Sequence, residues 1–138
     1  MKKLCLLFAL IFTLICTVPT YAYEIEEPEP EDPVEPYVYT MSTNESFHII
    51  NDTVYVTATY RGNSGATGAT IEITLQKRFL LFWWTDVEGG HWTDTFTTSS
   101  GTSNHSLAVP SGTYRVVINY KVYGSGGDYD EISKIVDQ

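Results

Sequence analysis

Polar and apolar residues alternate along three segments of the chain. In residues 53–61 the apolar side chains occupy every second position from Val54 to Tyr60. Residues 69–78 and 113–123 repeat this pattern. A period of two, carried by β-branched and aromatic residues, is typical of half-buried antiparallel strands. We therefore predict a strand in each of these segments.

Clusters of Gly, Pro, Asn, Asp and Ser separate the apolar segments and predict turns. We expect the pair Gly89-Gly90 to join two short strands as a hairpin. No segment has a helical period of useful length. The other turns are expected at residues 51–52, 62–68, 99–104, 110–112 and 124–128, and weaker strands at residues 37–42, 46–50, 83–87, 92–97, 105–109 and 129–136.

The number and spacing of these strands predict the fold class. Seven to nine short strands joined by tight turns within about 100 residues are typical of a β-sandwich. We therefore predict that residues 37–138 form one all-β domain, an antiparallel β-sandwich. A domain of this size folds without disulfides if its core is well filled.

The first 22 residues have a different pattern. Lys2 and Lys3 precede an apolar run from Leu4 to Val18, and small residues follow as far as Ala22. This is the layout of a bacterial secretory signal peptide that is cut after Ala22. The run is short for a membrane span, so we expect a processed protein released outside the cell. Processing would remove both cysteines, and with them any disulfide or thiol nucleophile.

Residues 23–36 are dominated by charge and proline. Seven acidic residues and four prolines leave Ile25 and Val34 as the aliphatic residues of this segment. Such a composition favours a stiff, solvated and disordered spacer without a core. The mature chain would carry 17 acidic and 6 basic residues, a net charge of −11, although the domain after the spacer is only mildly acidic. This balance argues against nucleic acid or an anionic membrane as a partner.

One turn resembles a known structural corner. Residues 109–118 place Pro110 and Gly112 in a turn just before Tyr114, at the start of a predicted strand. This arrangement resembles the tyrosine corner of fibronectin type III and other immunoglobulin-like domains. The resemblance implies that the Tyr114 hydroxyl bonds back to nearby backbone.

The chain also resembles a family of small, uncharacterised β-sandwich proteins secreted by Gram-positive bacteria. The matching parts are the signal peptide, residues 68–73, a Trp-containing strand after them, His105-Ser106, residues 112–115 and the Gly-rich turn at residues 124–127. The resemblance implies a location and a fold, and no activity. The acidic spacer and the run from Phe79 to Trp84 depart from it.

Six consecutive apolar residues, Phe79 to Trp84, follow Lys77 and Arg78. A half-exposed strand cannot bury both faces of such a run. Either the run folds over an open end of the sandwich, or it forms an exposed patch for binding or membrane contact. If the chain is extended there, Trp83 and Trp84 point to opposite faces, so at most one of them joins the core.

Aromatic side chains are the candidates for ligand contact, because a flat ring suits the apolar face of a sugar. A tyrosine-rich composition also fits an ordinary strand-forming role. The candidate ligand-binding residues are Phe82, Trp83, Trp84 and Trp92.

A weak calcium site is one interpretation of the Gly-rich turn near the C-terminal end. Asp128, Asp130 and Glu131 follow the turn and supply oxygen ligands, but they lack the fuller ligand set of a twelve-residue calcium loop. The alternative is that these charges protect the last strand from edge-to-edge pairing.

Other catalytic and metal signatures are weak. The three histidines are isolated and lack the spacing of metal ligands. No Gly-x-Ser-x-Gly motif frames a serine. Glu88 with Asp86 or Asp94 could form the carboxylate pair of a glycosidase, but any acidic chain contains such pairs. We therefore predict no catalytic residue, no metal site and no cofactor.

These patterns together predict a secreted, non-enzymatic binding domain at or outside the cell envelope. Its expected partner is an extracellular glycan or protein, and a membrane partner is less favoured. Two alternatives stay open: a structural protein that self-assembles through the apolar run, and a membrane-active hairpin formed by residues 79–96.

Overall fold

The computed structural model describes residues 37–138, which form seven β-strands and no helix. The predicted signal peptide and acidic spacer lie outside the described residues. The part of the chain that is described thus contains no helix capable of spanning a membrane. The strands are β1 (Thr40–Ile50), β2 (Thr53–Gly62), β3 (Ala66–Phe79), β4 (Trp83–Phe96), β5 (Ser100–Ala108), β6 (Tyr114–Gly124) and β7 (Tyr129–Asp137).

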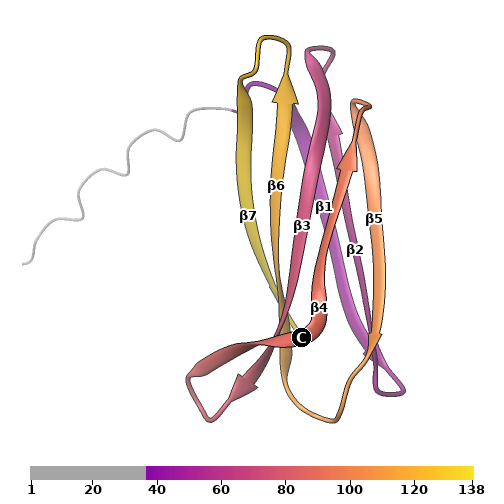
Figure 1. The fold of residues 1–138 in the computed structure, drawn as a ribbon, viewed down its shortest axis with the longest axis vertical. Helices are drawn as coiled ribbons and strands as arrows, with labels where there is room; N and C mark the ends of the chain where they lie inside the picture. Colours follow the sequence, from indigo (N-terminus) through magenta and orange to yellow (C-terminus); the bar gives the residue numbers. More distant parts are fainter. Residues whose placement is uncertain (1–36) are drawn as a thin grey trace, which may run out of the picture. The chain divides into compact units, whose positions relative to one another are not determined.

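The strands form two antiparallel sheets that face each other (Figure 1). One sheet has the order β1-β2-β5 and the other has the order β4-β3-β6-β7. The connections β2–β3, β4–β5 and β5–β6 pass from one sheet to the other, whereas the remaining connections are hairpins within a sheet. The predicted all-β antiparallel sandwich is confirmed.

The core lies between the sheets and is supplied mainly by the three central strands. Alternate residues of β2, β3 and β6 are buried, as the period of two predicts. The apolar side chains with the least exposure are Val54, Val56, Ala58, Tyr60, Ala69, Ile71, Ile73, Leu75, Val109, Tyr114, Val116, Ile118, Tyr120, Val122 and Ile132.

Two segments whose polar composition predicts a break between strands belong to strands that pair with β2. Residues 99–104 were expected to form a turn, but β5 begins at Ser100. Its polar side chains bond across to β2: the Thr57 hydroxyl donates to Asn104 Oδ1 at 2.8 Å, and the hydroxyls of Thr59 and Thr102 lie 3.0 Å apart. Likewise, the two weak strands expected within residues 37–50 are a single edge strand, β1. Solvent-facing positions of a strand accept polar residues, so the turn-like composition was misleading.

The hairpin predicted at Gly89-Gly90 is wrong, because β4 runs through both residues without reversing. The chain accommodates them as a β-bulge: Thr74 pairs with His91 and Gln76 with Asp86, so Leu75 alone faces residues 87–90. Gly89 has a φ of 74°, in the left-handed region that glycine adopts easily. A Cβ on Gly90 would lie only 2.8 Å from the Cβ of Leu75. The glycines therefore allow a bulge and a bend rather than a turn.

Two polar contacts fasten the ends of the fold. The Tyr114 hydroxyl donates to the Pro110 carbonyl at 2.5 Å, the bond that the tyrosine-corner resemblance implies. At the start of β1, the Asp130 carboxylate accepts the backbone N–H groups of Val38, Tyr39 and Thr40 at 2.7–3.0 Å. Because Thr40 begins β1 of one sheet and Asp130 lies on β7 of the other, the carboxylate ties one sheet to the other.

Candidate functional site: the β3–β4 hairpin tip

The hairpin of β3 and β4 extends beyond the strand beside it. Pairing of β3 with β6 ends at Lys77 opposite Tyr114. Past that point Arg78 pairs with Trp84 and Phe79 with Trp83 across the hairpin. The Arg78 N–H also donates to the Thr113 carbonyl at 2.9 Å, so contact with the neighbouring segment ends at Arg78. Figure 1 shows this two-stranded end bending away from the body of the sandwich. We call Phe79, Leu80, Leu81, Phe82 and Trp83 the hairpin tip.

All five side chains of the hairpin tip are exposed. Their exposed fractions run from 58% at Phe79 to 80% at Phe82. The alternative in which this run folds over the open end of the sandwich is therefore wrong, and the run is an exposed apolar patch. The physical reason is the length of the hairpin, because β3 and β4 continue past the first residue of β6 and have no paired strand beside them there.

The turn at the end of the hairpin has an unusual residue in a strained position. Leu80 has a φ of 57°, in the left-handed region where glycine or asparagine is ordinarily favoured. Its side chain is nevertheless 73% exposed, so burial within the domain gives no compensation for this conformation. Neither local backbone preference nor solubility favours leucine at this position.

The base of the hairpin is held by a polar network on the outer face of the four-stranded sheet. The Arg115 guanidinium lies 4.3 Å from the centre of the Trp84 ring, and its Nε–H donates to Gln76 Oε1 at 2.8 Å. The Gln76 amide in turn donates to Asp86 Oδ1 at 2.8 Å. This network joins β3, β4 and β6, and it fixes where the hairpin leaves the sheet.

The four predicted contact residues thus occupy three environments. Phe82 and Trp83 belong to the exposed hairpin tip, whereas Trp84 is half-buried beneath Arg115. The opposite orientation of Trp83 and Trp84 follows from strand geometry, as expected, and neither belongs to the buried core. Trp92 lies farther along β4, beyond the bulge, and packs against the core. The structure therefore brings Phe82 and Trp83 together and separates both from Trp92.

Trp92 belongs to a second cluster, which the sequence did not reveal. Its ring stacks on the imidazole of His105 with the centroids 5.0 Å apart and the planes within 8° of parallel. His105 Nε2 lies 2.6 Å from Asp94 Oδ2, and the Ser103 hydroxyl donates to the same oxygen. These residues lie on β4 and β5, the edge strands of opposite sheets. Alternation shows which residues share a strand face, but only the stacking of the sheets brings the two faces together.

The Asp94 cluster stabilises an ionised carboxylate. The Ser103 hydrogen bond lowers the pKa of Asp94, partial burial opposes this effect, and His105 lowers the pKa further. Ser103 and His105 both bind the carboxylate and not each other. A serine nucleophile needs its proton directed at a base such as the imidazole, so this arrangement does not form a nucleophile–base pair.

Metal ligands do not gather within residues 37–138. No three side chains of His, Asp or Glu converge there on one point. Both carboxylate oxygens of Asp130 accept backbone N–H groups from the segment that leads into β1, and the Thr40 hydroxyl also donates to one of them at 2.9 Å. The calcium interpretation of Asp128, Asp130 and Glu131 therefore finds no support in this geometry.

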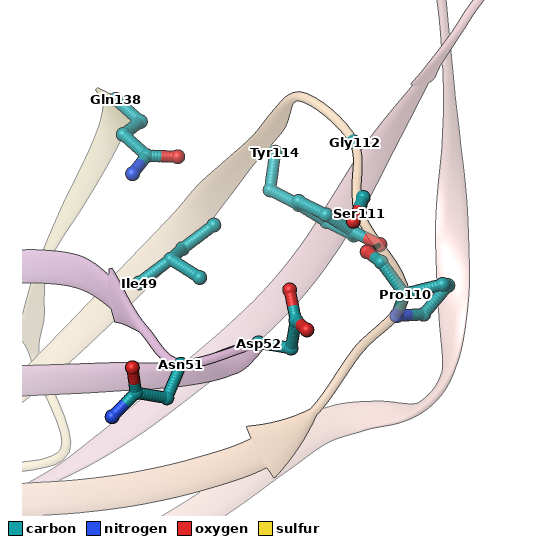
Figure 2. Close-up of a pocket in the computed structure, with 8 residues that line it drawn as sticks. All are labelled: Ile49, Asn51, Asp52, Pro110, Ser111, Gly112, Tyr114 and Gln138. Atoms are coloured by element: carbon teal, nitrogen blue, oxygen red, sulfur yellow. Dashed lines mark hydrogen bonds between the residues drawn. The ribbon is translucent and has the colours of Figure 1, made fainter.

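Two surface pockets lie on the part of the chain that the structure describes. The first, of about 340 Å³, lies at one end of the sandwich, and Figure 2 shows the residues around it. The second, of about 320 Å³, lies on the four-stranded sheet. The first is lined by Ile49, Asn51, Asp52, Pro110, Ser111, Gly112, Tyr114 and Gln138, and the second by Thr70, Glu72, Asn119, Tyr120, Lys121, Tyr123 and Glu131.

Comparison with protein-family models finds no family that matches this chain, and comparison with curated proteins finds no similar sequence. The resemblance to a secreted Gram-positive family therefore stays a prediction. The hairpin tip remains the candidate site on its geometry alone.

Proposed function

We propose that this protein is an extracellular, non-enzymatic binding domain that engages an apolar target through the hairpin tip. The observation that carries the proposal is the exposure of five consecutive apolar side chains on a two-stranded extension. Contiguous exposed apolar residues are characteristic of interaction sites. The extension makes few contacts with the domain, so its side chains contribute little to folding and are free for a partner.

The energetics favour a binding role. Burial of one Leu or Phe side chain contributes about 1.5–3 kcal/mol. Insertion of Leu80, Leu81 and Phe82 into an apolar environment would therefore contribute about 5–9 kcal/mol of favourable free energy, from which the entropic cost of association is subtracted. The rigid base formed by Trp84 and Arg115 supports this, because it holds the hairpin in place before the partner arrives.

The composition of the tip favours an apolar target over a glycan. A sugar ring offers one apolar face, but its hydroxyls need hydrogen-bonding partners. The leucines and phenylalanines of the tip have no polar side-chain atoms, and Trp83 supplies one indole N–H. We therefore favour an apolar target over a glycan bound through Trp83.

Retention on fractions of a bacterial cell envelope tests the proposal. The purified protein is compared with Leu80→Ser/Leu81→Ser and with the control Ile50→Ser/Ile135→Ser, which removes two similarly apolar side chains that are 55% and 57% exposed elsewhere. Loss of the two leucines is expected to remove about 3 kcal/mol of binding free energy, about 100-fold in affinity. The control should bind as the parent does. Equal retention of parent and tip variant would show that the tip is not the contact surface.

We also propose that the sandwich is of the fibronectin type III-like kind. The Tyr114 hydrogen bond to Pro110 supports this type. So does the position of β4, which pairs with β3, whereas constant-type immunoglobulin domains place their fourth strand beside the fifth.

A further inference from the structure

We propose that the apolar target of the hairpin tip is the surface of a lipid bilayer, which the tip enters to the depth of the headgroup and upper acyl region. This inference rests on the proposed function, since it names the partner of the same site. Three features of the hairpin support it: its shape, the order of its side chains and the placement of positive charge at its base.

The shape of the tip suits a soft, featureless surface. Beyond Arg78 the hairpin is two strands wide and ends in the exposed turn of Leu80, Leu81 and Phe82. A protruding apolar turn needs either a matching concave pocket or a medium that opens around it. A bilayer interface opens in this way, and it leaves the polar backbone groups of a turn in contact with water and headgroups.

The side chains change character in order along the hairpin. Leu80, Leu81 and Phe82 lie at the end, followed by the pair of Phe79 and Trp83, and then by Arg78 opposite Trp84. The side chains that a bilayer favours change with depth in the same order. The hydrocarbon favours aliphatic side chains, the interface favours aromatic ones, and the headgroups attract cations. At about 3.3 Å per strand residue, the apolar part matches the usual insertion depth of about 5–10 Å.

Three cationic side chains lie at the base of the hairpin, where Asp86 and Asp137 are their acidic neighbours. Residues 37–138 contain six Lys and Arg residues, and three of them, Lys77, Arg78 and Arg115, lie there. Arg115 stacks on Trp84, and the Lys77 ammonium lies 5.6 Å from the centre of the Tyr114 ring. The cations therefore lie at the level where phosphate groups would be, on a domain whose overall charge is negative.

The two described pockets of a second copy are poor receptors for the tip. Each pocket includes polar side chains such as Asn51 and Asp52, or Glu72 and Glu131. Five apolar side chains would leave those polar groups without water or hydrogen bonds, which is costly. Insertion of the tip into either of these pockets is therefore less favourable than insertion into lipid.

Vesicle binding tests the inference. The purified protein is mixed with vesicles of phosphatidylcholine, with or without phosphatidylglycerol, and sedimented at low and physiological salt. We expect the protein to sediment with vesicles, and Trp fluorescence to shift to the blue and be quenched by lipids brominated on their acyl chains. In Trp83→Phe the quenching should fall sharply while sedimentation persists, because Trp84 lies at the level of the headgroups and Trp92 lies away from the tip.

The variants separate this inference from the proposed function. Leu80→Ser/Leu81→Ser should weaken vesicle binding by about 100-fold, whereas Ile50→Ser/Ile135→Ser should not change it. If the protein fails to bind either vesicle but the envelope fraction retains it through the leucines, the target is a protein or another polymer and the lipid inference is overturned. Self-association that the tip variant abolishes, without vesicle binding, would also overturn it. If the tip variant binds vesicles and envelope as the parent does, both proposals fail.

Discussion

The guanidinium of Arg115 on β6 stacks on the indole of Trp84 on β4, with 4.3 Å between the Arg115 Cζ and the ring centre. Such a cation–π contact contributes about 0.5–1 kcal/mol at exposed sites and more when it is shielded from water. Trp83, the next residue, points away from this contact and is 68% exposed. Two adjacent tryptophans thus have separate roles, one at the base of the hairpin and one in its tip.

This difference predicts opposite effects of two alanine substitutions. Trp84→Ala should lower the free energy of unfolding by about 2 kcal/mol, through lost packing and the lost Arg115 contact. Trp83→Ala should change it by no more than about 0.5 kcal/mol, as for other exposed positions, while weakening vesicle binding. Urea denaturation followed by circular dichroism measures both. A large loss of stability in Trp83→Ala would contradict the assignment of roles.

Tyr114→Phe tests the tyrosine corner. The substitution keeps the buried ring and removes the hydroxyl that donates to the Pro110 carbonyl. We expect the free energy of unfolding to fall by about 1 kcal/mol, the usual net value of a hydrogen bond. Tyr55→Phe, on the exposed side of β2, is the matched control and should be nearly neutral. An equal effect of the two substitutions would show that the corner bond contributes nothing.

Asp130→Asn tests the link between the sheets. The amide keeps the shape of the carboxylate, but it loses the charge and turns a donor toward backbone N–H groups. The free energy of unfolding should fall by about 2 kcal/mol, and the amide protons of Tyr39 and Thr40 should exchange faster with solvent. Unchanged exchange at these two amides would show that the Asp130 carboxylate does not link the sheets.

The same carboxylate predicts a dependence of stability on pH. Burial raises the pKa of Asp130, but hydrogen bonds from the N–H groups of Tyr39 and Val38 and from Thr40 outweigh it, so the folded pKa lies below the ordinary value. Its contribution is therefore complete above the unfolded pKa of about 4 and is lost as pH falls through the folded pKa. Asp94, whose pKa is also lowered, adds to this loss. Unfolding midpoints measured downward from pH 5 should fall less steeply in Asp130→Asn.

Gly90→Ala tests the bulge that aims the hairpin. The new Cβ would lie 2.8 Å from the Cβ of Leu75 and 3.1 Å from the Val87 carbonyl oxygen, atoms that cannot rotate away. We expect a loss of about 2 kcal/mol from overpacking, together with weaker vesicle binding because the hairpin direction changes. Gly65→Ala, where the nearest atom would be the Asn63 Oδ1 at 3.3 Å, serves as the control. Full stability in Gly90→Ala would show that β4 does not need a glycine there.

The candidate site was only partly predictable from the sequence. Six adjacent apolar residues marked Phe79 to Trp84 as unusual, and alternation put Trp83 and Trp84 on opposite faces. Exposure was not predictable, because it depends on β6 ending its pairing at Tyr114 while β3 continues to Phe79. Relative strand lengths and the neighbour of each strand are properties of the sheet. The sequence also grouped Trp92 with Trp83 and Trp84, because Gly89-Gly90 has the composition of a hairpin turn that would bring them together. In the structure these glycines belong to a bulge within one continuous strand, and Trp92 lies away from the other two.

The amino-acid sequence by itself determined the class of fold and the contents of the core. Side chains on a strand alternate between two faces, so the buried residues of β2, β3 and β6 can be identified without knowing what covers them. Only the tertiary structure decided which polar segments are strands, which faces meet at Asp94, Ser103 and His105, and which apolar residues stay exposed. These outcomes depend on contacts between residues far apart in the chain, and local periodicity carries no information about them.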